Sequence, residues 1–463
     1  MSQARQVIER NWTMVAKLIN FWFLLRSSLW FVPSLMVIGG MLLSFLAIFV
    51  DEALQLVWLR DFQSIYSGGP DGARAVLATI AGSMIGVTGI VFSITIVTLT
   101  LASSQFGPRL LRNFMRDLGN QIVLGTFIAT FVYCLLVLSM VTDTSDDRFV
   151  PYISITIGIA LSLASLGVLI YFIHHTSVAI QADTVLASVS QDLHDTIERL
   201  FPERIGEGGQ DPGNTLENMG LEPGTEPYGQ VILASASGYI QVIDGDHLMH
   251  LASEHDVILR LEHQPGDFAI EGCPVATLWP AVKADADLAA SLNRAFVLGS
   301  QRTYAQDVGF AMDQLVEIAC RALSPGINDP FTAVACVDRL GAALCQLAER
   351  AIPSSYRYDA DARLRVIAPA TTFVYLSDKA MTPIRQYCRT SITVTLRLLE
   401  IISLVATHVS REEDRLSLSQ QAGMIHQGGL EGLPIEQDRQ RVEKSYQKAL
   451  QALGVAQTMP SNR

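Results

Sequence analysis

Small and hydroxylated side chains recur along one face of an apolar segment that covers residues 76–107. In a bilayer such a face lets another backbone approach closely, because packing rather than hydrophobic drive holds helices together there. Two interpretations are open: a packed helix whose hydroxyls bond back to their own carbonyls, or a helix that lines a polar path for ions in an oligomer. We call this set the small-residue face, and its members are Thr79, Gly82, Gly86, Gly89, Ser93, Ile96, Thr100, Ser103 and Gly107.

Three arginines follow the small-residue face, at Arg109, Arg112 and Arg116. Arginines at this place ordinarily fix the orientation of a span and contact lipid phosphates. If the preceding helix lines a pore, the same side chains would form a positive ring at its cytosolic mouth and favour anions.

Two adjacent histidines, His174 and His175, end the last predicted span at the same side of the membrane. An imidazole can gain a proton near neutral pH, so these residues are either proton sensors at the mouth or ordinary interfacial side chains. Adjacent residues on a helix point about 100° apart, so we do not expect the two rings to share one ligand.

The sequence SPGINDP, residues 324–330, separates two apolar helical stripes. We expect Gly326 to end the first helix in a left-handed conformation, and Asp329 to cap the second with Pro330 at its first position. The alternative is a ligand turn, in which Ser324, Asn328 and Asp329 work with the free amides of the second helix.

Four histidines lie among carboxylates within residues 244–263, and they are His247, His250, His255 and His263. Histidine and carboxylate ligands suit zinc, but H-x-x-H without cysteines is a weak signal. A solvated face explains them better, so we expect no metal and no cofactor. The chain also lacks a nucleophile elbow, a phosphate-binding glycine loop and a metalloprotease helix, and we therefore expect no enzyme.

Four apolar stretches are long enough to cross a bilayer, at residues 29–50, 76–103, 122–141 and 151–173. They form a transmembrane domain at 29–175, after an amphipathic interfacial helix at 1–28. Basic residues precede the first span and follow the second, which places both termini in the cytosol. We expect a multi-pass protein of a bacterial inner membrane.

The remaining chain predicts an α+β region in the cytosol. It is divided into a stalk helix at 176–205, a flexible linker at 206–227, a small β-rich module at 228–283 and a helical domain at 284–463. Within the last, one long helix is expected to start at Thr382 and Pro383 and to reach Val405. Arg397 and Glu400 sit at pairing distance in its centre, which argues against a fifth span.

Charge divides the chain unevenly. Residues 1–175 hold 10 Lys and Arg against 9 Asp and Glu, so the total of -12 becomes +1 there and -13 in the remainder. An acidic C-terminal part argues against nucleic acid as a partner. The six cysteines have no C-x-x-C spacing and are expected to be reduced and mostly buried.

Two motifs, SSQFGPRLLRNFMRD and RALSPGINDPFTAVACVDRL, resemble a family of bacterial predicted membrane proteins known only as a domain of unknown function. The resemblance covers nearly the whole chain and implies four spans plus a cytosolic domain, with no activity. From the residues, the leading hypothesis is a homo-oligomeric channel or channel-like transporter, with the bilayer, further copies of the chain and ions as partners. The alternative is a membrane-anchored sensor or scaffold that does not conduct.

Overall fold

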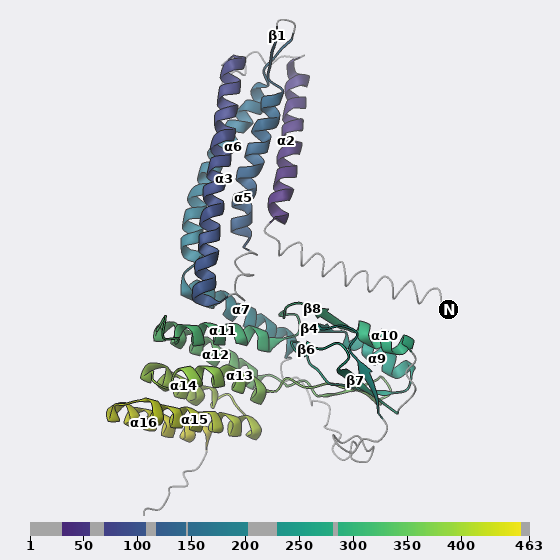
Figure 1. Ribbon diagram of the computed structural model, residues 1–463, viewed down its shortest axis with the longest axis vertical. Coiled ribbons are helices and arrows are strands. Elements are labelled where there is room, and N and C mark those ends of the chain that lie inside the picture. Colours follow the sequence, from purple (N-terminus) through teal and green to yellow (C-terminus); the bar gives the residue numbers. More distant parts are fainter. Residues whose placement is uncertain are drawn as a thin grey trace, which may run out of the picture. The chain divides into compact units, whose positions relative to one another are not determined.

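The computed structural model describes residues 30–55, 69–107, 117–144, 147–201, 229–280 and 286–454 (Figure 1). The chain divides into two compact units, Met1–Thr184 and Val185–Arg463. We call them the membrane unit and the C-terminal unit. The interfacial helix predicted at 1–28 and the linker predicted at 206–227 lie outside the described residues.

Four long apolar helices build the membrane unit, which confirms the predicted fold class. They are α2 (Phe31–Gln55), α3 (Pro70–Phe106), α5 (Leu118–Ser139) and α6 (Tyr152–Ala179). Each is long and apolar enough to cross a bilayer. With 37 residues, α3 begins earlier than predicted, because Pro70 occupies a first-turn position where its missing N–H costs nothing.

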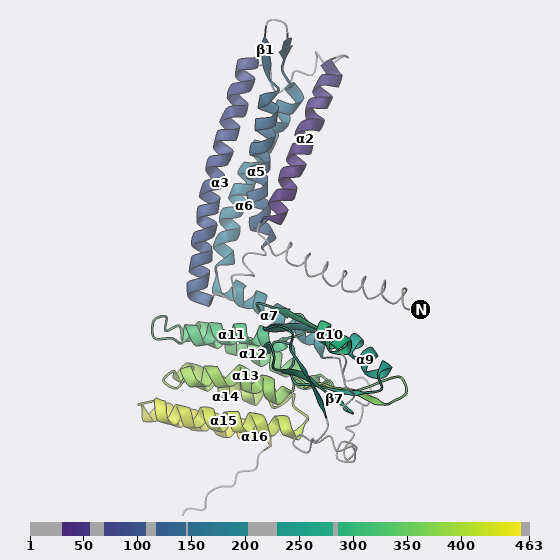
Figure 2. The same ribbon diagram turned by 45° about the vertical axis from the view of Figure 1, so that its right-hand side comes forward.

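Helix α5 is the centre of the membrane unit, since it contacts α2, α3 and α6 (Figures 1 and 2). Phe127 of α5 and Phe172 of α6 are fully buried in one apolar cluster, and Tyr133 and Leu77 are buried in another. A short antiparallel hairpin, β1 (Thr142–Thr144) and β2 (Asp147–Phe149), connects α5 to α6. We call this side of the bundle the hairpin end and the opposite side the α7 end.

The segment predicted as a stalk is not one continuous helix. Helix α6 ends at Ala179, and α7 (Ala182–Leu200) begins after a turn at Ile180 and Gln181. Its apolar face is buried. Two polar residues of α7 also contact later parts of the C-terminal unit. His194 Nδ1 lies 2.8 Å from Gln346 Oε1, and Arg199 donates to the carbonyl of Tyr304. From Val185 onward α7 is therefore a packed element of the C-terminal unit.

Two sheets form the β part of the C-terminal unit. The five-stranded sheet has the order β3 (Gln230–Leu233), β7 (Pro274–Trp279), β5 (Ile258–Leu261), β10 (Leu364–Ile367), β9 (Tyr356–Tyr358). The three-stranded sheet has the order β6 (Phe268–Ala269), β4 (Gly238–Ile243), β8 (Phe296–Gly299). Helices α9 (Gly245–Glu254) and α10 (Ala286–Arg294) pack with them around one core. Strands β8, β9 and β10 come from beyond residue 283.

Six helices lie in stacked layers in the C-terminal unit (Figures 1 and 2). The prediction of one long helix from Thr382 to Val405 is wrong, because two helices cover this region. Pro383 lies inside α13, whose cap is Thr372, and a break at 388–391 separates α13 from α14. The predicted pair of Arg397 and Glu400 is confirmed at 2.8 Å. The helices are α11 (Val308–Ala322), α12 (Pro330–Glu349), α13 (Phe373–Tyr387), α14 (Ile392–Val405), α15 (Glu412–Gly432) and α16 (Glu436–Leu453).

Candidate functional site

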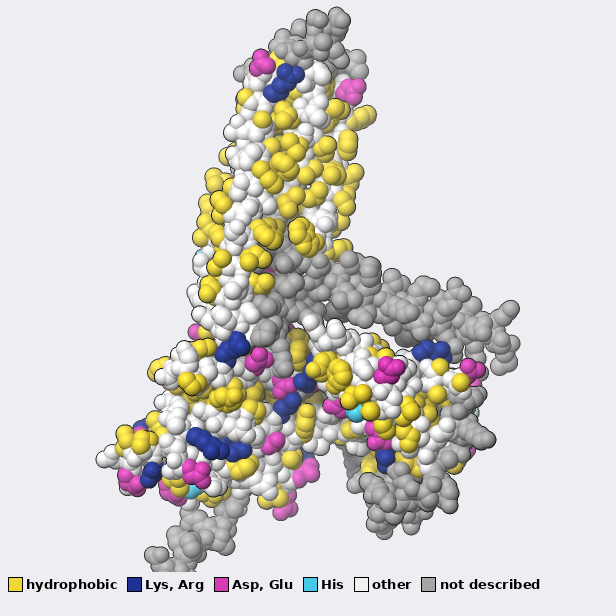
Figure 3. Space-filling view, in the orientation of Figure 1, with side chains coloured by type: hydrophobic (Ala, Val, Ile, Leu, Met, Phe, Trp, Pro, Cys, Tyr) yellow, Lys and Arg dark blue, Asp and Glu magenta, His cyan; other side chains and the backbone are white. Residues whose placement is uncertain are grey.

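From Thr79 to Thr100 the small-residue face of α3 points away from the other described helices of the chain, whereas Ser103 is half-buried and Gly107 is buried. A Cβ built at Gly82, Gly86 or Gly89 would meet nothing within 4 Å. Ser93 and Thr100 are exposed as well, whereas the opposite side of α3 is buried against α5 and α6. That buried side consists of Ala73, Leu77, Ala81, Met84, Val91, Thr98, Ala102 and Phe106. In Figure 3 the visible side of the membrane unit carries apolar side chains with white areas between them, where backbone or other uncharged side chains lie at the surface.

Hydroxyls on α3 donate to carbonyls one turn back along the same helix. Thr79 Oγ1 donates to the carbonyl of Ala75 at 2.7 Å, and Thr100 Oγ1 to that of Ile96 at 2.9 Å. Thr88 and Thr95 make the same bond. These four threonines thus satisfy their hydroxyl protons within the helix, which leaves each of their oxygens able to accept a further hydrogen bond.

The two predicted histidines of the α7 end have different surroundings. His174 is exposed. His175 Nε2 lies 2.5 Å from Asp117 Oδ2, and its ring stacks on Tyr171 with centroids 5.2 Å apart. Asp117 was not predicted, although a carboxylate just before an apolar span is a signal for a helix cap. The predicted arginines Arg109, Arg112 and Arg116 lie outside the described residues.

A second carboxylate, Asp51, caps a helix to which it does not belong. It is 6 % exposed at the C-terminal part of α2. Its two oxygens accept from the amides of Ile153 and Ser154 at 2.9 Å each, and from Ser154 Oγ at 2.6 Å. The residue before α6 is Pro151, which offers no side-chain cap, so Asp51 satisfies the orphan amides. Sequence spacing cannot reveal a cap that is 102 residues away.

The SPGINDP turn has the predicted cap but not the predicted glycine. Asp329 caps α12, with Oδ1 accepting from the Phe331 and Thr332 amides at 3.1 Å. The Thr332 hydroxyl, followed by these amides, holds the pKa of Asp329 below its usual value. Asn328, with φ 50°, takes the left-handed conformation that was predicted for Gly326, because an Asn side chain tolerates it.

The other oxygens of this turn serve the turn itself. Ser324 Oγ donates to the carbonyl of Arg321 at 2.6 Å, and the Asn328 amide donates to the carbonyl of Ser324. Asp313, on the helix that precedes the turn, binds Arg302 and Lys379. The ligand role predicted for Ser324, Asn328 and Asp329 stays a prediction.

Three of the four histidines around α9 have separate side-chain neighbours. His250 faces Glu254 on its own helix at 3.6 Å, and His263 faces Asp267 at 3.7 Å. His247 Nε2 lies 3.5 Å from Ser291 Oγ. Among the described residues, no three His, Cys, Asp or Glu side chains converge in a way that would hold a metal ion.

A charged cluster that the sequence did not suggest joins three parts of the C-terminal unit. Arg302 reaches Asp307 at 2.7 Å and Asp313 at 2.5 Å, and Lys379 of α13 reaches the other oxygen of Asp313 at 3.0 Å. Asp307 also caps α11 through the Phe310 amide, and a Cβ at Gly266 would clash with its carboxylate. Burial raises the pKa of Asp307, which Arg302 opposes.

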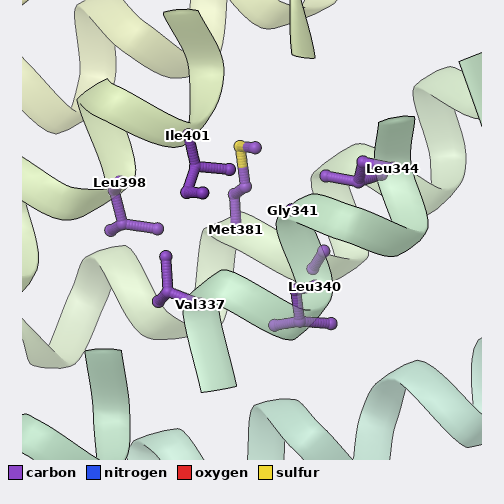
Figure 4. A pocket seen from close by; sticks show the side chains of 8 residues that line it. Val337, Leu340, Gly341, Leu344, Met381, Leu398 and Ile401 are labelled. Atoms are coloured by element: carbon purple, nitrogen blue, oxygen red, sulfur yellow. The ribbon is translucent and has the colours of Figure 1, made fainter. Parts of the chain in front are cut away.

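A small apolar cavity lies between α12, α13 and α14 (Figure 4). Its volume is about 10 Å³, which is near the minimum for one water molecule. Because the lining is apolar, it suits neither water nor a polar ligand. The lining residues are Val337, Leu340, Gly341, Leu344, Ala380, Met381, Leu398 and Ile401. Helix α12 meets the length and hydropathy of a span, yet half of its most apolar window is buried and it packs on α11 and α14.

The thiols fit structural rather than reactive roles. Cys134, Cys336 and Cys388 are buried, Cys320 and Cys345 are half-buried, and Cys273 is exposed. Burial raises the pKa of Cys336 to about 12 and that of Cys388 to about 11. Thiols held protonated in this way are poor nucleophiles.

Comparison with known proteins identifies the family. The family described as "Predicted membrane protein (DUF2254)" matches residues 26–403. The chain belongs to this family. Uncharacterized proteins of Mycobacterium tuberculosis (strain H37Rv) and Mycobacterium bovis are each 33 % identical to it over 384 residues, which is 82 % of this chain and 72 % of each relative. No solved structure matches the chain. DUF2254 membership agrees with the resemblance seen in the two sequence motifs, and it carries no assigned activity.

Proposed function

We propose that the protein is a homo-oligomeric channel or channel-like transporter of a bacterial inner membrane, with α3 lining the conducting path and the C-terminal unit regulating it. One observation carries the proposal: from Thr79 to Thr100 the small-residue face of α3 is uncovered by the rest of the described chain. Three glycines and several hydroxyls that face lipid would gain neither close packing nor new hydrogen bonds. Against the same face of α3 in another copy of the chain, they allow close helix contact and a polar lining.

The chemistry of the α3 lining favours passive conduction of ions. The helix has no ionisable side chain between Val76 and Phe106, so it offers no group for a proton-coupled cycle. Threonine oxygens on this face keep acceptor capacity after donating to the helix. Several such oxygens from symmetry-related helices would replace part of an ion's hydration shell.

A second candidate function is a membrane-anchored sensor or scaffold. It is favoured by the same internal hydroxyl bonds of Thr79 and Thr100, because a helix that satisfies its own hydroxyls can pack against a dry neighbour. In that case α3 assembles the oligomer, and the C-terminal unit binds a partner or ligand without conduction.

Ion flux through the purified protein in sealed liposomes distinguishes the two functions, with anions and cations tested separately. Ser93→Leu adds a bulky apolar side chain to the small-residue face. Ala164→Leu is the matched control, because Ala164 is an exposed position on α6. Oligomer mass in detergent is measured for both variants.

A channel predicts flux in the wild type, flux in Ala164→Leu and at least a tenfold loss in Ser93→Leu with the oligomer still formed. No wild-type flux under any ion or pH gradient contradicts the channel. An oligomer that Ser93→Leu dissociates, together with absent wild-type flux, supports the scaffold.

A further inference from the structure

The α7 end of the membrane unit holds a carboxylate with two tasks. Asp117 Oδ1 accepts from the Gly119 amide at 2.8 Å and so caps α5. Asp117 Oδ2 lies 2.5 Å from His175 Nε2 near the end of α6. One side chain therefore starts one helix and fixes the end of another.

The backbone makes room for this contact. A Cβ at Gly119 would lie 2.7 Å from His175 Nε2, so only glycine fits beside the ring. On the other side Tyr171 stacks on the imidazole, and its hydroxyl lies 3.4 Å from Nδ1. Both ring nitrogens of His175 thus have a polar neighbour.

The helices beside this contact carry buried polar atoms that no described residue satisfies. Asn120 and Thr176 are 9 % and 8 % exposed, and Asn120 Oδ1 and Thr176 Oγ1 have no hydrogen-bond partner among the described residues. Buried polar groups of this kind are costly, and hydration would satisfy them. Closed packing of α5 on α6 at this end therefore competes with a more open, hydrated arrangement.

We propose that Asp117 and His175 form a proton-operated latch between α5 and α6. When His175 is protonated, the bond to Asp117 joins two opposite charges, and such bonds are about twice as strong as neutral ones. When His175 is neutral, the weaker bond lets water reach Asn120 and Thr176. Acidification closes the latch and alkalinisation opens it.

Among the described residues, Asp117 is the charged side chain that lies within ion-pair distance of His175. Tyr171 is the second titratable neighbour, and His174 is exposed on an adjacent position. The described parts of α2 and α3 have their charged residues at the hairpin end, namely Asp51, Glu52, Asp71 and Arg74. The latch lies near the end of α6, and α7 begins three residues after α6 ends. It does not depend on whether the protein conducts.

Hydrogen exchange of the full chain in lipid nanodiscs tests the latch. Protection factors, corrected for the intrinsic pH dependence of exchange, are compared at pH 5.5 and 8.0 for amides 119–122 and 176–180. We expect at least threefold higher protection at pH 5.5. His175→Gln keeps an N–H donor without a titratable charge, so its protection should be equal at both pH values.

His174→Gln is the matched control and should keep the wild-type difference. Gly119→Ala leaves every charge in place but displaces the ring, so it should also abolish the difference. Equal wild-type protection at the two pH values overturns the proposal. So does a pH difference that survives in both His175→Gln and Gly119→Ala.

Discussion

The membrane unit and the C-terminal unit use glycine in opposite ways. On α12 a Cβ at Gly341 would lie 2.7 Å from two atoms of Ile401, so the missing side chain is explained by the contact of α12 with α14. On α3 a Cβ at Gly82, Gly86 or Gly89 would meet nothing within 4 Å. Packing among the described residues therefore requires glycine at position 341, but it does not require glycine at positions 82, 86 and 89.

Open glycines are not the rule throughout the membrane unit. A Cβ at Gly125 of α5 would lie 2.5 Å from Met36 Sδ and 3.1 Å from Pro33 Cα of α2. Glycine in a helix interior costs roughly 0.5–1 kcal/mol relative to alanine. At Gly125 and Gly341 close packing offsets that cost. On α3 no described residue supplies that offset, which is why the comparison points to a second copy.

The two units also differ in how they hold buried charge. In the C-terminal unit Arg302, Asp307, Asp313 and Lys379 neutralise one another across elements. In the membrane unit Asp51 meets backbone amides and a hydroxyl rather than a cation. A helix N-terminus supplies partial positive charge without placing a second ionised side chain in the bilayer.

Among the proposed substitutions, removing Arg302 should lower the stability of the C-terminal unit the most. Arg302→Met leaves Asp307 and Asp313 without their shared cation. The free energy of unfolding of the C-terminal unit should therefore fall by about 3–5 kcal/mol. Urea unfolding of the full chain in micelles, read by pulse proteolysis, measures it. Arg441→Met is the control, because Arg441 pairs with Asp438 at the surface and should matter by less than about 0.5 kcal/mol. Equal losses in both variants would mean that the cluster is not a structural centre.

Adding one methyl group at a glycine of each unit tests the comparison between the packed and the open glycines. Gly341→Ala should destabilise the C-terminal unit by about 1–3 kcal/mol, because Ile401 cannot move freely from the new Cβ. Gly86→Ala should leave the folded chain unharmed or raise its stability by up to about 1 kcal/mol.

Oligomer mass in micelles completes that experiment. Under the proposed assembly, Gly86→Ala weakens association while Gly341→Ala does not. If Gly86→Ala neither weakens the oligomer nor changes flux, the open glycines of α3 have no partner, and the comparison loses its meaning.

Much of the fold could be predicted from the sequence, because its signals are local. Four apolar runs predicted the four long helices, and Asp329 followed by Pro330 predicted the start of α12. Prediction failed where a distant partner decides the outcome. Pro383 suggested a helix start, but α13 extends through it from Thr372.

The contacts that define the candidate sites were missed for the same reason. His175 was recognised, but its partner Asp117 lies 58 residues earlier, and Asp51 lies 102 residues from Ile153. The small-residue face was visible in sequence, whereas its openness depends on how α5 and α6 cover the opposite side. Periodicity gives a face of a helix, and only packing decides whether that face is covered.

Helix capping offers a smaller test, within the membrane unit. Asp51→Ala removes the acceptor for two amides and one hydroxyl at the start of α6, which should cost about 2 kcal/mol. Hydrogen exchange of the Ile153 and Ser154 amides should quicken by more than tenfold. Asp51→Asn keeps one acceptor oxygen and should lose less. If both variants exchange like the wild type, α6 is capped by another group.

Asp329 performs the same task in the C-terminal unit, at the protein surface, and acid should reveal it. Its pKa is lowered in the fold by the Thr332 hydroxyl and the first amides of α12. A carboxyl whose folded pKa is lowered stabilises the fold fully above its unfolded value of about 3.9, and loses this contribution as pH falls through the folded value. Asp329→Ala should therefore cost about 1 kcal/mol at pH 7 and progressively less below pH 4.

Pulse proteolysis in urea at pH 7, 4 and 3 measures this convergence of Asp329→Ala with the wild type. A constant difference at all three pH values would show that the side chain acts through packing rather than through its charge. Convergence would establish Asp329 as a local cap that acid can switch off, because its hydrogen-bond donors lie within three residues of it at the surface. Asp51 is the contrasting case, since its donors belong to a different helix and the site is nearly closed to solvent.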